Sequence, residues 1–369
     1  KAVEYFLKRK AEASDDILLK NHIEMFHFGC TSEDINNLAY AGMMRDAREN
    51  ILIPKIDLLN DLLRELIIGT ASISMVSRTH GQPASPTTVG KELANYRMRL
   101  RISKEHFKAV KIFGKLNGAV GNFNAHVIAD PKINWPEVSR SFIEEDLGFI
   151  MNELTTQIEP HDWVARYSNE LIVMNSILID LCRDLWAYIS LGYFKQIKEK
   201  NEVGSSTMPH KVNPIDFENA EGNLGLSSSL LQHFSTKLPV SRYQRDLSDS
   251  TVMRNIGVAI GYTFLSLDST VRGLKKIEPN KSRVYQDIEN TWEVLAEPIQ
   301  MVMRKNGISN AYEKLKAISR GEHLDRKQIS AFIESLDLPE KDKNTLLALL
   351  PSDYIGLAEE LAKKEVEKD

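Results

Sequence analysis

The chain has 369 residues, of which 42% are hydrophobic and 27% charged, as in an ordinary globular protein. This length exceeds one typical hydrophobic core, so we expect two or more packed units. The 47 basic and 51 acidic side chains give a net charge of −4, and no excess of positive charge indicates a nucleic-acid or anionic-membrane partner.

Cysteine usage and the first residues bear on the cellular setting. Cys30 and Cys182 lie too far apart for a disulfide framework or a metal-ligand cluster, which favours a reducing, cytoplasmic location. The opening KAVEYFLKRK has no initiator Met and no signal core, so we expect it to come from inside a longer protein.

Helical periodicity dominates the chain. Apolar residues recur at spacings of three or four in 51–67 and 171–189, and 91–113 and 251–276 are also helix-like. The run 171–194 is the most apolar, but Asp180, Arg183 and Asp184 interrupt it, which favours a buried helix over a membrane span. Strand-type alternation bounded by turns is hard to find, so we predict an all-α fold.

Four irregular stretches rich in Gly, Pro, Ser, Thr and Asn interrupt the helices: 26–37, 77–88, 114–126 and 204–214. Each also carries His, Lys or a carboxylate. Long helices joined by polar, reactive segments indicate a rigid bundle whose loops hold a site.

The first stretch, FHFGCTSEDINN, has the residues of a helix start. Thr31 or Ser32 can cap that helix, whose free amides can also bind an anion, and His27 lies just before it. Taken alone, an ordinary helix cap remains the alternative.

Two further stretches place histidines beside turns. In SRTHGQPASPTT, His80 stands between Thr79 and Gly81 and can act as an acid or a base, or can simply be a hydrogen-bonded turn residue. In TTQIEPHD, Gln157 and His161 precede the most apolar helix, where capping and ligand binding both remain open.

The stretch GSSTMPHKVNP (204–214) is the most reactive in composition. A glycine and two prolines prevent one unbroken helix. Ser205 or Ser206 can serve as nucleophile or base if His210 and Lys211 supply a positive field, and Lys211 with Asn213 can bind a carboxylate. A solvated loop with helix caps is the alternative.

The segment SRYQRDLSDSTVMR (241–254) combines arginines and serines. Arg242, Arg245 and Arg254 flank Ser248 and Ser250, a combination that suits a phosphate, although a solvated helix face also explains it. The sequence shows no metal-ligand spacing, no GxGxxG motif and no P-loop, so we predict neither a metal nor a cofactor.

These motifs resemble those of a known superfamily. GSSTMPHKVNP resembles the signature loop of the fumarase/aspartase superfamily, GSS-x-MP-x-K-x-NP, and THGQPASP and FGCTSEDINN resemble two further family regions. TTQIEPHD, FENAEGNLGL and KLPVSRYQRDLSDSTVMRN are similar to bacterial adenylosuccinate lyases. The resemblance runs from Lys1 to near the C-terminus.

The resemblance implies a long central helical bundle with small helical flanking domains. We expect residues 1–25 to be the remnant of an N-terminal helical domain, 26–264 the central bundle with the active-site loops, and 265–369 a C-terminal helical domain. The family carries a His-Asp pair immediately before the position of Lys1, and most of a small helical domain before that pair. It forms homotetramers whose sites lie where three subunits meet.

The implied reaction is a β-elimination in the cytoplasm, without a cofactor. Adenylosuccinate gives AMP and fumarate, and the succinyl-carboxamide ribotide of purine synthesis (SAICAR) gives AICAR and fumarate. Small molecules are the expected substrates, with no nucleic acid and no membrane.

The resemblance also implies a role for individual residues. Ser205 is the carbanion-forming base, His80 the general acid, Glu218 the residue that positions that histidine, and His27 a further active-site histidine. The implied substrate-binding residues are Lys211 and Asn213 for the succinyl carboxylates, Thr31, Ser32, Thr79 and Gln157 as further contacts, and Arg245, Ser250 and Arg254 around the nucleotide phosphate and carboxylate.

Two alternatives stay open. Another lyase of the superfamily, acting on argininosuccinate, would have a similar loop, but the cluster in 241–254 favours a phosphorylated substrate. A catalytically silent helical scaffold, such as the lens crystallins recruited from this superfamily, would not need Ser205, His80, Lys211 and Glu218.

Overall fold

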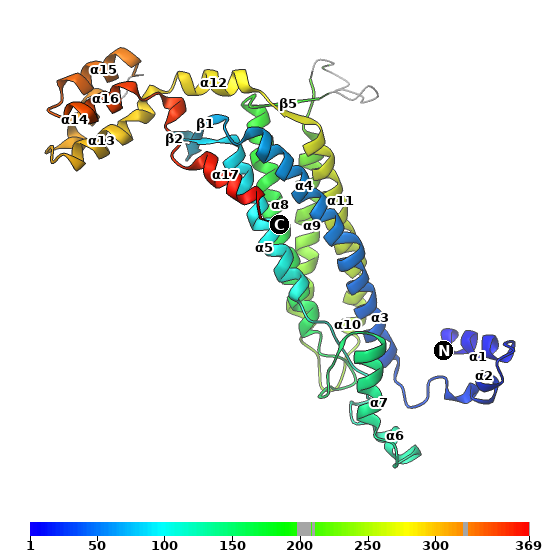
Figure 1. Cartoon of the computed structure of the whole chain (residues 1–369). Coiled ribbons are helices and arrows are strands. Elements are labelled where there is room, and N and C mark those ends of the chain that lie inside the picture. The colour runs from blue at the N-terminus through cyan, green and yellow to red at the C-terminus, as the bar shows by residue number, and fades with distance from the viewer. Residues whose placement is uncertain (198–207, 209–210, 320–323, 369) are drawn as a thin grey trace. The chain divides into compact units, whose positions relative to one another are not determined.

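The structure, a computed structural model, describes residues 1–197, 208, 211–319 and 324–368 (Figure 1). Helices make up most of it, and the strands of the described residues form three two-stranded sheets, which confirms the predicted all-α class. The residues form two compact units, each discontinuous in sequence. The first unit comprises Lys1–Pro54, Ser103–Asn175 and Gly225–Phe264, and the second Lys55–Ile102, Ser176–Leu224 and Leu265–Asp369.

Five long helices contribute residues to both units. They are α4 (Ile53–Thr70), α5 (Val89–Ala109), α8 (Asp162–Ser190), α9 (Ile215–Lys237) and α11 (Ile256–Lys275). Most of each of the four runs with helical periodicity falls on one of these helices, although the run 251–276 begins before α11 does. None of the helices described is long and apolar enough to cross a lipid bilayer.

The first unit adds short elements to its share of these helices. They are α1 (Ala2–Glu12), α2 (Ile17–Asn21), α3 (Ser32–Ala47), α6 (Asn124–Ala129), α7 (Trp135–Ser141), α10 (Ser248–Met253) and the paired strands β3 (Phe113–Gly114) and β4 (Ile150–Met151). Tyr167 is completely buried in this unit, with its ring centroid 4.7 Å from that of Phe107. The Tyr167 hydroxyl donates to the carbonyl of Met44 at 3.2 Å, so α3, α5 and α8 meet there.

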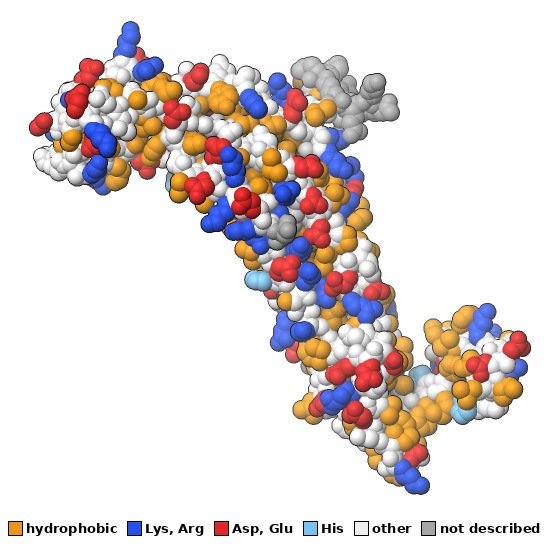
Figure 2. All heavy atoms as spheres, in the orientation of Figure 1, with side chains coloured by type: hydrophobic (Ala, Val, Ile, Leu, Met, Phe, Trp, Pro, Cys, Tyr) orange, Lys and Arg blue, Asp and Glu red, His pale blue; other side chains and the backbone are white. Residues whose placement is uncertain are grey.

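Helices α1 and α2 bury little apolar surface. Their apolar side chains gather on the outside of this segment (Figure 2), and more than a third of each of the following is exposed: Val3, Tyr5, Phe6, Leu7, Ile17, Leu18 and Leu19. The domain boundaries that we predicted between residues 25 and 26 and between residues 264 and 265 stay a prediction.

The second unit contains the remaining elements. They are β1 (Ser74–Thr79), β2 (Gln82–Thr88), β5 (Phe194–Gln196), β6 (Ile277–Pro279), α12 (Lys281–Glu289), α13 (Ala296–Lys305), α14 (Ala311–Ser319), α15 (Arg326–Ser335), α16 (Glu340–Ala348) and α17 (Ala358–Val366). Leu59, Leu63, Leu178 and Leu181 are completely buried, as their helical spacing predicts. Helices α13 to α16 enclose a cluster of their own that includes Ile299, Met303, Ile329 and Ile333.

One local prediction was wrong. We predicted an irregular stretch at 77–88, but β1 and β2 form an antiparallel hairpin in which Thr79 pairs with Gln82. Pro83 and Pro86 cannot donate to a strand ladder, but β2 has a neighbour on one side only, where prolines are tolerated. Helix α12 packs against β1, and α17 contacts β2 (Figure 1).

Candidate active site

The start of α3 carries three of the predicted residues. Thr31 is the N-cap, as predicted, and its backbone N–H donates to Asp34 Oδ2 at 2.8 Å. Ser32 is the exposed first residue of the helix. His27 is also exposed and has a φ of 71°, in the left-handed region that histidines adopt more often than bulky residues do.

A buried ion pair holds this helix start in place. Lys115 Nζ lies 2.9 Å from Asp34 Oδ1, and both side chains are 0% exposed. The ammonium also donates to the carbonyls of Gly118 at 2.9 Å and Gln157 at 2.8 Å. Burial lowers the pKa of Lys115, and the facing Asp34 opposes that shift. The pair therefore ties the α3 N-terminus to the backbone of Gln157.

Gln157 and Arg245, both predicted to bind substrate, lie together. Arg245 Nη1 donates to Gln157 Oε1 at 3.2 Å, although 88 positions separate them. The Gln157 amide donates to the carbonyl of Ala119 at 3.1 Å, and its backbone N–H donates to the carbonyl of Gln244 at 3.2 Å. The oxygen and the nitrogen of the Gln157 side-chain amide are therefore both hydrogen-bonded, as is its backbone N–H.

Buried acid groups surround Arg245. Its Nη2 lies 3.2 Å from Glu33 Oε2 and 3.9 Å from Asp249 Oδ2. Burial raises the pKa of Glu33 despite the nearby guanidinium. Burial also opposes the ionisation of Asp249, but the neighbouring His161, a hydrogen bond from the backbone of Ser250 and the charge of Arg245 hold the pKa of Asp249 below its usual value.

Histidine 161 completes this cluster. Its Nε2 is 3.8 Å from Asp249 Oδ2, and its Nδ1 is 3.9 Å from Glu159 Oε2. Glu33, His161 and Asp249 place one possible ligand atom each within 4.8 Å of one another, close enough for a metal ion. The Arg245 guanidinium already faces both carboxylates, so the cluster has its own cation.

Ser250 and Arg254 lie on and just after the short helix α10. Ser250 is half-buried in the helix, and Arg254 is exposed at its C-cap. Within the described part of the chain, neither side chain is bonded to another predicted site residue. The phosphate-binding role of these two residues stays a prediction.

In the second unit, His80 lies at the tip of the β1–β2 hairpin. His80 and Gly81 form a two-residue turn with φ angles of 54° and 74°, the combination of a type I′ turn. Glycine adopts this conformation freely, whereas histidine does so under strain. The turn leaves His80 and the neighbouring Thr79 exposed.

The residue before Thr79 anchors this hairpin. Arg78 Nη2 lies 2.7 Å from Asp287 Oδ2 on α12, and the Tyr193 hydroxyl donates to the same carboxylate. The hairpin that carries Thr79 and His80 is thereby fixed to α12.

The predicted reactive loop is described only in part. Ser205 lies outside the described residues, as does His210. Lys211 is exposed and Asn213 half-buried, and Gln196 Nε2 donates to the carbonyl of Val212 between them at 2.7 Å. This bond fixes the backbone at Val212, between Lys211 and Asn213 and shortly before α9 begins.

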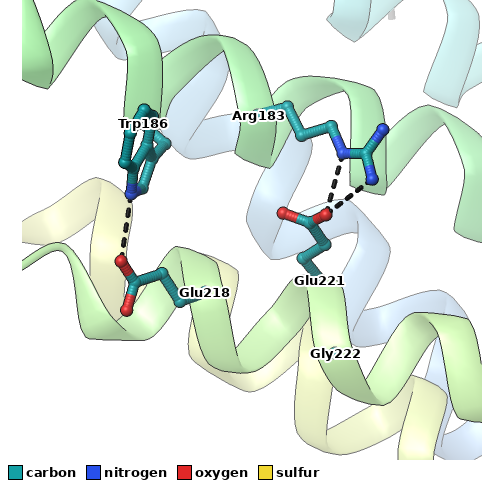
Figure 3. Close-up of a pocket in the computed structure, with 5 residues that line it drawn as sticks. All are labelled: Arg183, Trp186, Glu218, Glu221 and Gly222. Atoms are coloured by element: carbon teal, nitrogen blue, oxygen red, sulfur yellow. Dashed lines mark hydrogen bonds and ion pairs between the residues drawn. The ribbon is translucent and has the colours of Figure 1, made fainter.

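Glu218 lies in the first turn of α9 beside a pocket of about 330 Å³. The Trp186 indole donates to Glu218 Oε1 at 3.0 Å (Figure 3). One turn further along, Arg183 Nε donates to Glu221 Oε1 at 2.8 Å. Two polar pairs thus join α8 and α9 side by side.

The predicted residues therefore form two groups, one in each unit. In the first unit, hydrogen bonds and the Lys115–Asp34 pair connect Thr31, Gln157 and Arg245. In the second, Thr79 and His80 share the hairpin, Lys211 and Asn213 share a fixed segment, and Glu218 pairs with Trp186. No hydrogen bond or ion pair among the described residues links these last three places.

Comparison with known proteins identifies the family. A model described as "Lyase" matches residues 1–226, and one described as "Adenylosuccinate lyase C-terminal" matches residues 241–355. An adenylosuccinate lyase of Vibrio cholerae is 50% identical over 364 residues, covering 99% of this chain and 79% of that protein. The Escherichia coli K12 adenylosuccinate lyase is 50% identical over 358 residues, covering 97% and 78%.

The chain belongs to the adenylosuccinate lyase family. Solved structures agree on its fold. A 3-carboxy-cis,cis-muconate lactonizing enzyme from Pseudomonas putida superposes with a TM-score of 0.79 at 20% identity, covering 99% of this chain and 80% of that one. A fumarate lyase from Mesorhizobium has a TM-score of 0.77 at 16% identity, covering 95% and 81%. The predicted fumarase/aspartase-type helical bundle is thus confirmed.

Sequence reasoning missed several residues in this family member. Glu33 follows the predicted residue Ser32, and Asp249 precedes the predicted residue Ser250. Acidic residues are common in the first turn of a helix, so the sequence did not distinguish these two. Trp186 is one aromatic residue in an apolar run. Only His161 carried a signal of its own, as a polar residue before the most apolar helix.

Proposed function

We propose that this protein, a carbon–nitrogen lyase of the adenylosuccinate lyase family, eliminates fumarate from adenylosuccinate and from SAICAR in purine nucleotide biosynthesis. The first substrate gives AMP and the second AICAR. Membership of the family at about 50% identity over nearly the whole chain supports this reaction. The proposal places the enzyme in the cytoplasm.

The resemblance to the family assigns the catalytic roles in this reaction. Ser205 removes a proton from the carbon next to a succinyl carboxylate, and the electron pair forms the fumarate double bond as the C–N bond breaks. His80 gives its proton to the leaving nitrogen, and Glu218 orients that histidine. Lys211 and Asn213 bind the succinyl carboxylates, where positive and amide donors stabilise the developing charge. His27 is a further active-site histidine.

Substrate binding falls mainly to the first unit. Thr31, Ser32 and Gln157 contact the substrate, together with Thr79 of the second unit. Arg245, Ser250 and Arg254 bind around its phosphate. The observation that carries this assignment is the 3.2 Å hydrogen bond between Arg245 and Gln157. It joins two residues that lie far apart in the sequence near the N-terminus of α3, where free amides favour anions.

Neighbouring serines provide a matched test of the base. Ser205→Ala should abolish turnover but leave substrate binding largely intact, because a base acts in the transition state. Ser206→Ala makes the same chemical change one position later and should keep most of the turnover. The reverse pattern would show that Ser205 is not the base.

The proposed enzyme is a homotetramer whose active sites are shared between chains. Helix α8 leaves the large apolar side chains of Val173 and Trp186 about half exposed, as expected for a surface that another copy covers. Each of the proposed sites would combine residues of both groups from different subunits. A helix as long as α9, with 23 residues, rises about 34 Å, which favours such sharing.

Complementation tests the shared site. Inactive Ser205→Ala and His80→Ala proteins are mixed, dissociated and reassociated. Sharing predicts that part of the activity returns, because some sites then contain both wild-type residues. A verified mixed tetramer without activity, or a fully active monomer, would contradict it.

A further inference from the structure

Arg245 is held from several sides by other residues of the chain. Its Nη2 faces Glu33 at 3.2 Å and Asp249 at 3.9 Å, and its Nη1 donates to Gln157 at 3.2 Å. Only 16% of its side chain is exposed. The three partners come from α3, from α10 and from the segment before α8, so the guanidinium plane is fixed in more than one direction.

The contact with Glu33 is the closest charged one. Glu33 is itself only 5% exposed, so its carboxylate has few alternatives to Arg245. Asp249 stands farther away and also faces His161 at 3.8 Å. Glu33 is therefore the main anionic partner, and Asp249 supports it.

The arrangement leaves part of the arginine unused. Arg245 Nε is buried and has no hydrogen-bond partner in the described structure. Buried donors are normally paired, and an exception calls for an explanation. An arginine whose guanidinium is held in one orientation suits recognition of a phosphate.

Holding a long side chain before binding has a thermodynamic effect. A free arginine loses rotamer freedom when it binds a ligand, whereas one already fixed by the protein does not. We infer that Glu33 is a positioning residue for the proposed reaction, which holds the Arg245 guanidinium in the orientation that binds the substrate phosphate. The inference rests on the proposed function and deepens it.

The test compares Glu33→Gln with Arg245→Gln, using AMP and fumarate as inhibitors. Glu33→Gln should weaken AMP binding and raise KM about three- to tenfold, with kcat within about twofold, because the arginine must now be ordered on binding. Fumarate binding should not change, since the effect passes through the phosphate. The variant that combines Glu33→Gln with Arg245→Gln should bind AMP no more weakly than Arg245→Gln alone.

Glu365 provides the matched control. It is also 5% exposed and lies 3.3 Å from Arg97, but it is on α17 outside the proposed site. Glu365→Gln therefore removes an equally buried paired charge and should leave AMP binding unchanged. Glu33→Asp keeps the charge but withdraws it by one methylene, so it should also weaken AMP binding and serves if Glu33→Gln does not fold.

The outcomes distinguish the positioning role of Glu33 from the phosphate-binding role of Arg245. Normal AMP affinity in Glu33→Gln beside a clear loss in Arg245→Gln would overturn the positioning role alone. Equal losses of AMP affinity in Glu33→Gln and Glu365→Gln would also overturn it, since they indicate general destabilisation. Normal AMP affinity in Arg245→Gln would overturn the phosphate role of Arg245 and the inference with it.

Discussion

The indole Nε1 of Trp186 donates to Oε1 of Glu218 at 3.0 Å, from α8 to the first turn of α9. The carboxylate that we propose to orient His80 is thus itself oriented by an aromatic residue. The indole of Trp186 is a donor only, so it can bond to the carboxylate oxygen in one direction alone.

Trp186→Phe should lower turnover about two- to tenfold, the range expected when a hydrogen bond of about 0.5–1.5 kcal/mol is removed from a group that acts in the transition state. KM should change little. Steady-state kinetics on adenylosuccinate measures both. Arg183→Gln removes the adjacent pair with Glu221 and is the control, expected to stay within about twofold of the wild type. Equal losses in both variants would contradict a specific role for Trp186.

Replacing His80 by asparagine should lower turnover without lowering stability. It lies at a φ of 54°, which asparagine adopts more readily than histidine or alanine. His80→Asn should therefore be as stable as the wild type or more stable by up to about 1 kcal/mol. Loss of the general acid should reduce turnover by about 100- to 10,000-fold. Thermal unfolding alongside kinetics checks this, and a marked loss of stability in His80→Asn but not in His80→Ala would argue against strain.

The buried pair of Lys115 and Asp34 should dominate the local stability of the first unit. Asp34→Asn leaves the ammonium buried without its counter-ion, and we expect a loss of about 3–5 kcal/mol in the free energy of unfolding. Urea denaturation measures it. Glu153→Gln breaks the exposed pair with Arg140 and should change the free energy of unfolding far less. Similar values for the two variants would show that burial does not govern the pair.

The raised pKa of Glu33 predicts a pH dependence. Its ordinary value is 4.5, and burial in the folded state raises it despite the nearby Arg245 and His161. Just above pH 4.5 the folded protein therefore keeps a proton on Glu33 that the unfolded chain has released, so this group lowers stability as pH rises. The stability of the wild type minus that of Glu33→Gln should fall between pH 4.5 and neutrality. Urea midpoints at several pH values measure this difference, and a constant or rising difference would contradict the shift.

The sequence predicted the helices better than the contacts between them. The apolar spacing of 51–67 and 171–189 is a local property, and α4 and α8 follow it. The hairpin at 77–88 was missed because its ladder joins residues whose side chains do not alternate clearly and include Pro83 and Pro86.

The candidate site shows the same limit. Thr31 was recognisable as a cap because capping depends on residues within one turn. The partners of Arg245 were not, because Glu33 and Gln157 lie far from it in sequence and only the fold brings them together. The Trp186–Glu218 pair depends in the same way on how α8 packs against α9.

The central claim is that this protein cleaves adenylosuccinate. The most direct measurement is to incubate the purified protein separately with adenylosuccinate and with argininosuccinate and to quantify the products. We predict fumarate and AMP in equal amounts from adenylosuccinate, with no product when Ser205 is replaced by Ala, and none from argininosuccinate. Fumarate from argininosuccinate alone, or undiminished cleavage of adenylosuccinate by Ser205→Ala, would contradict the account.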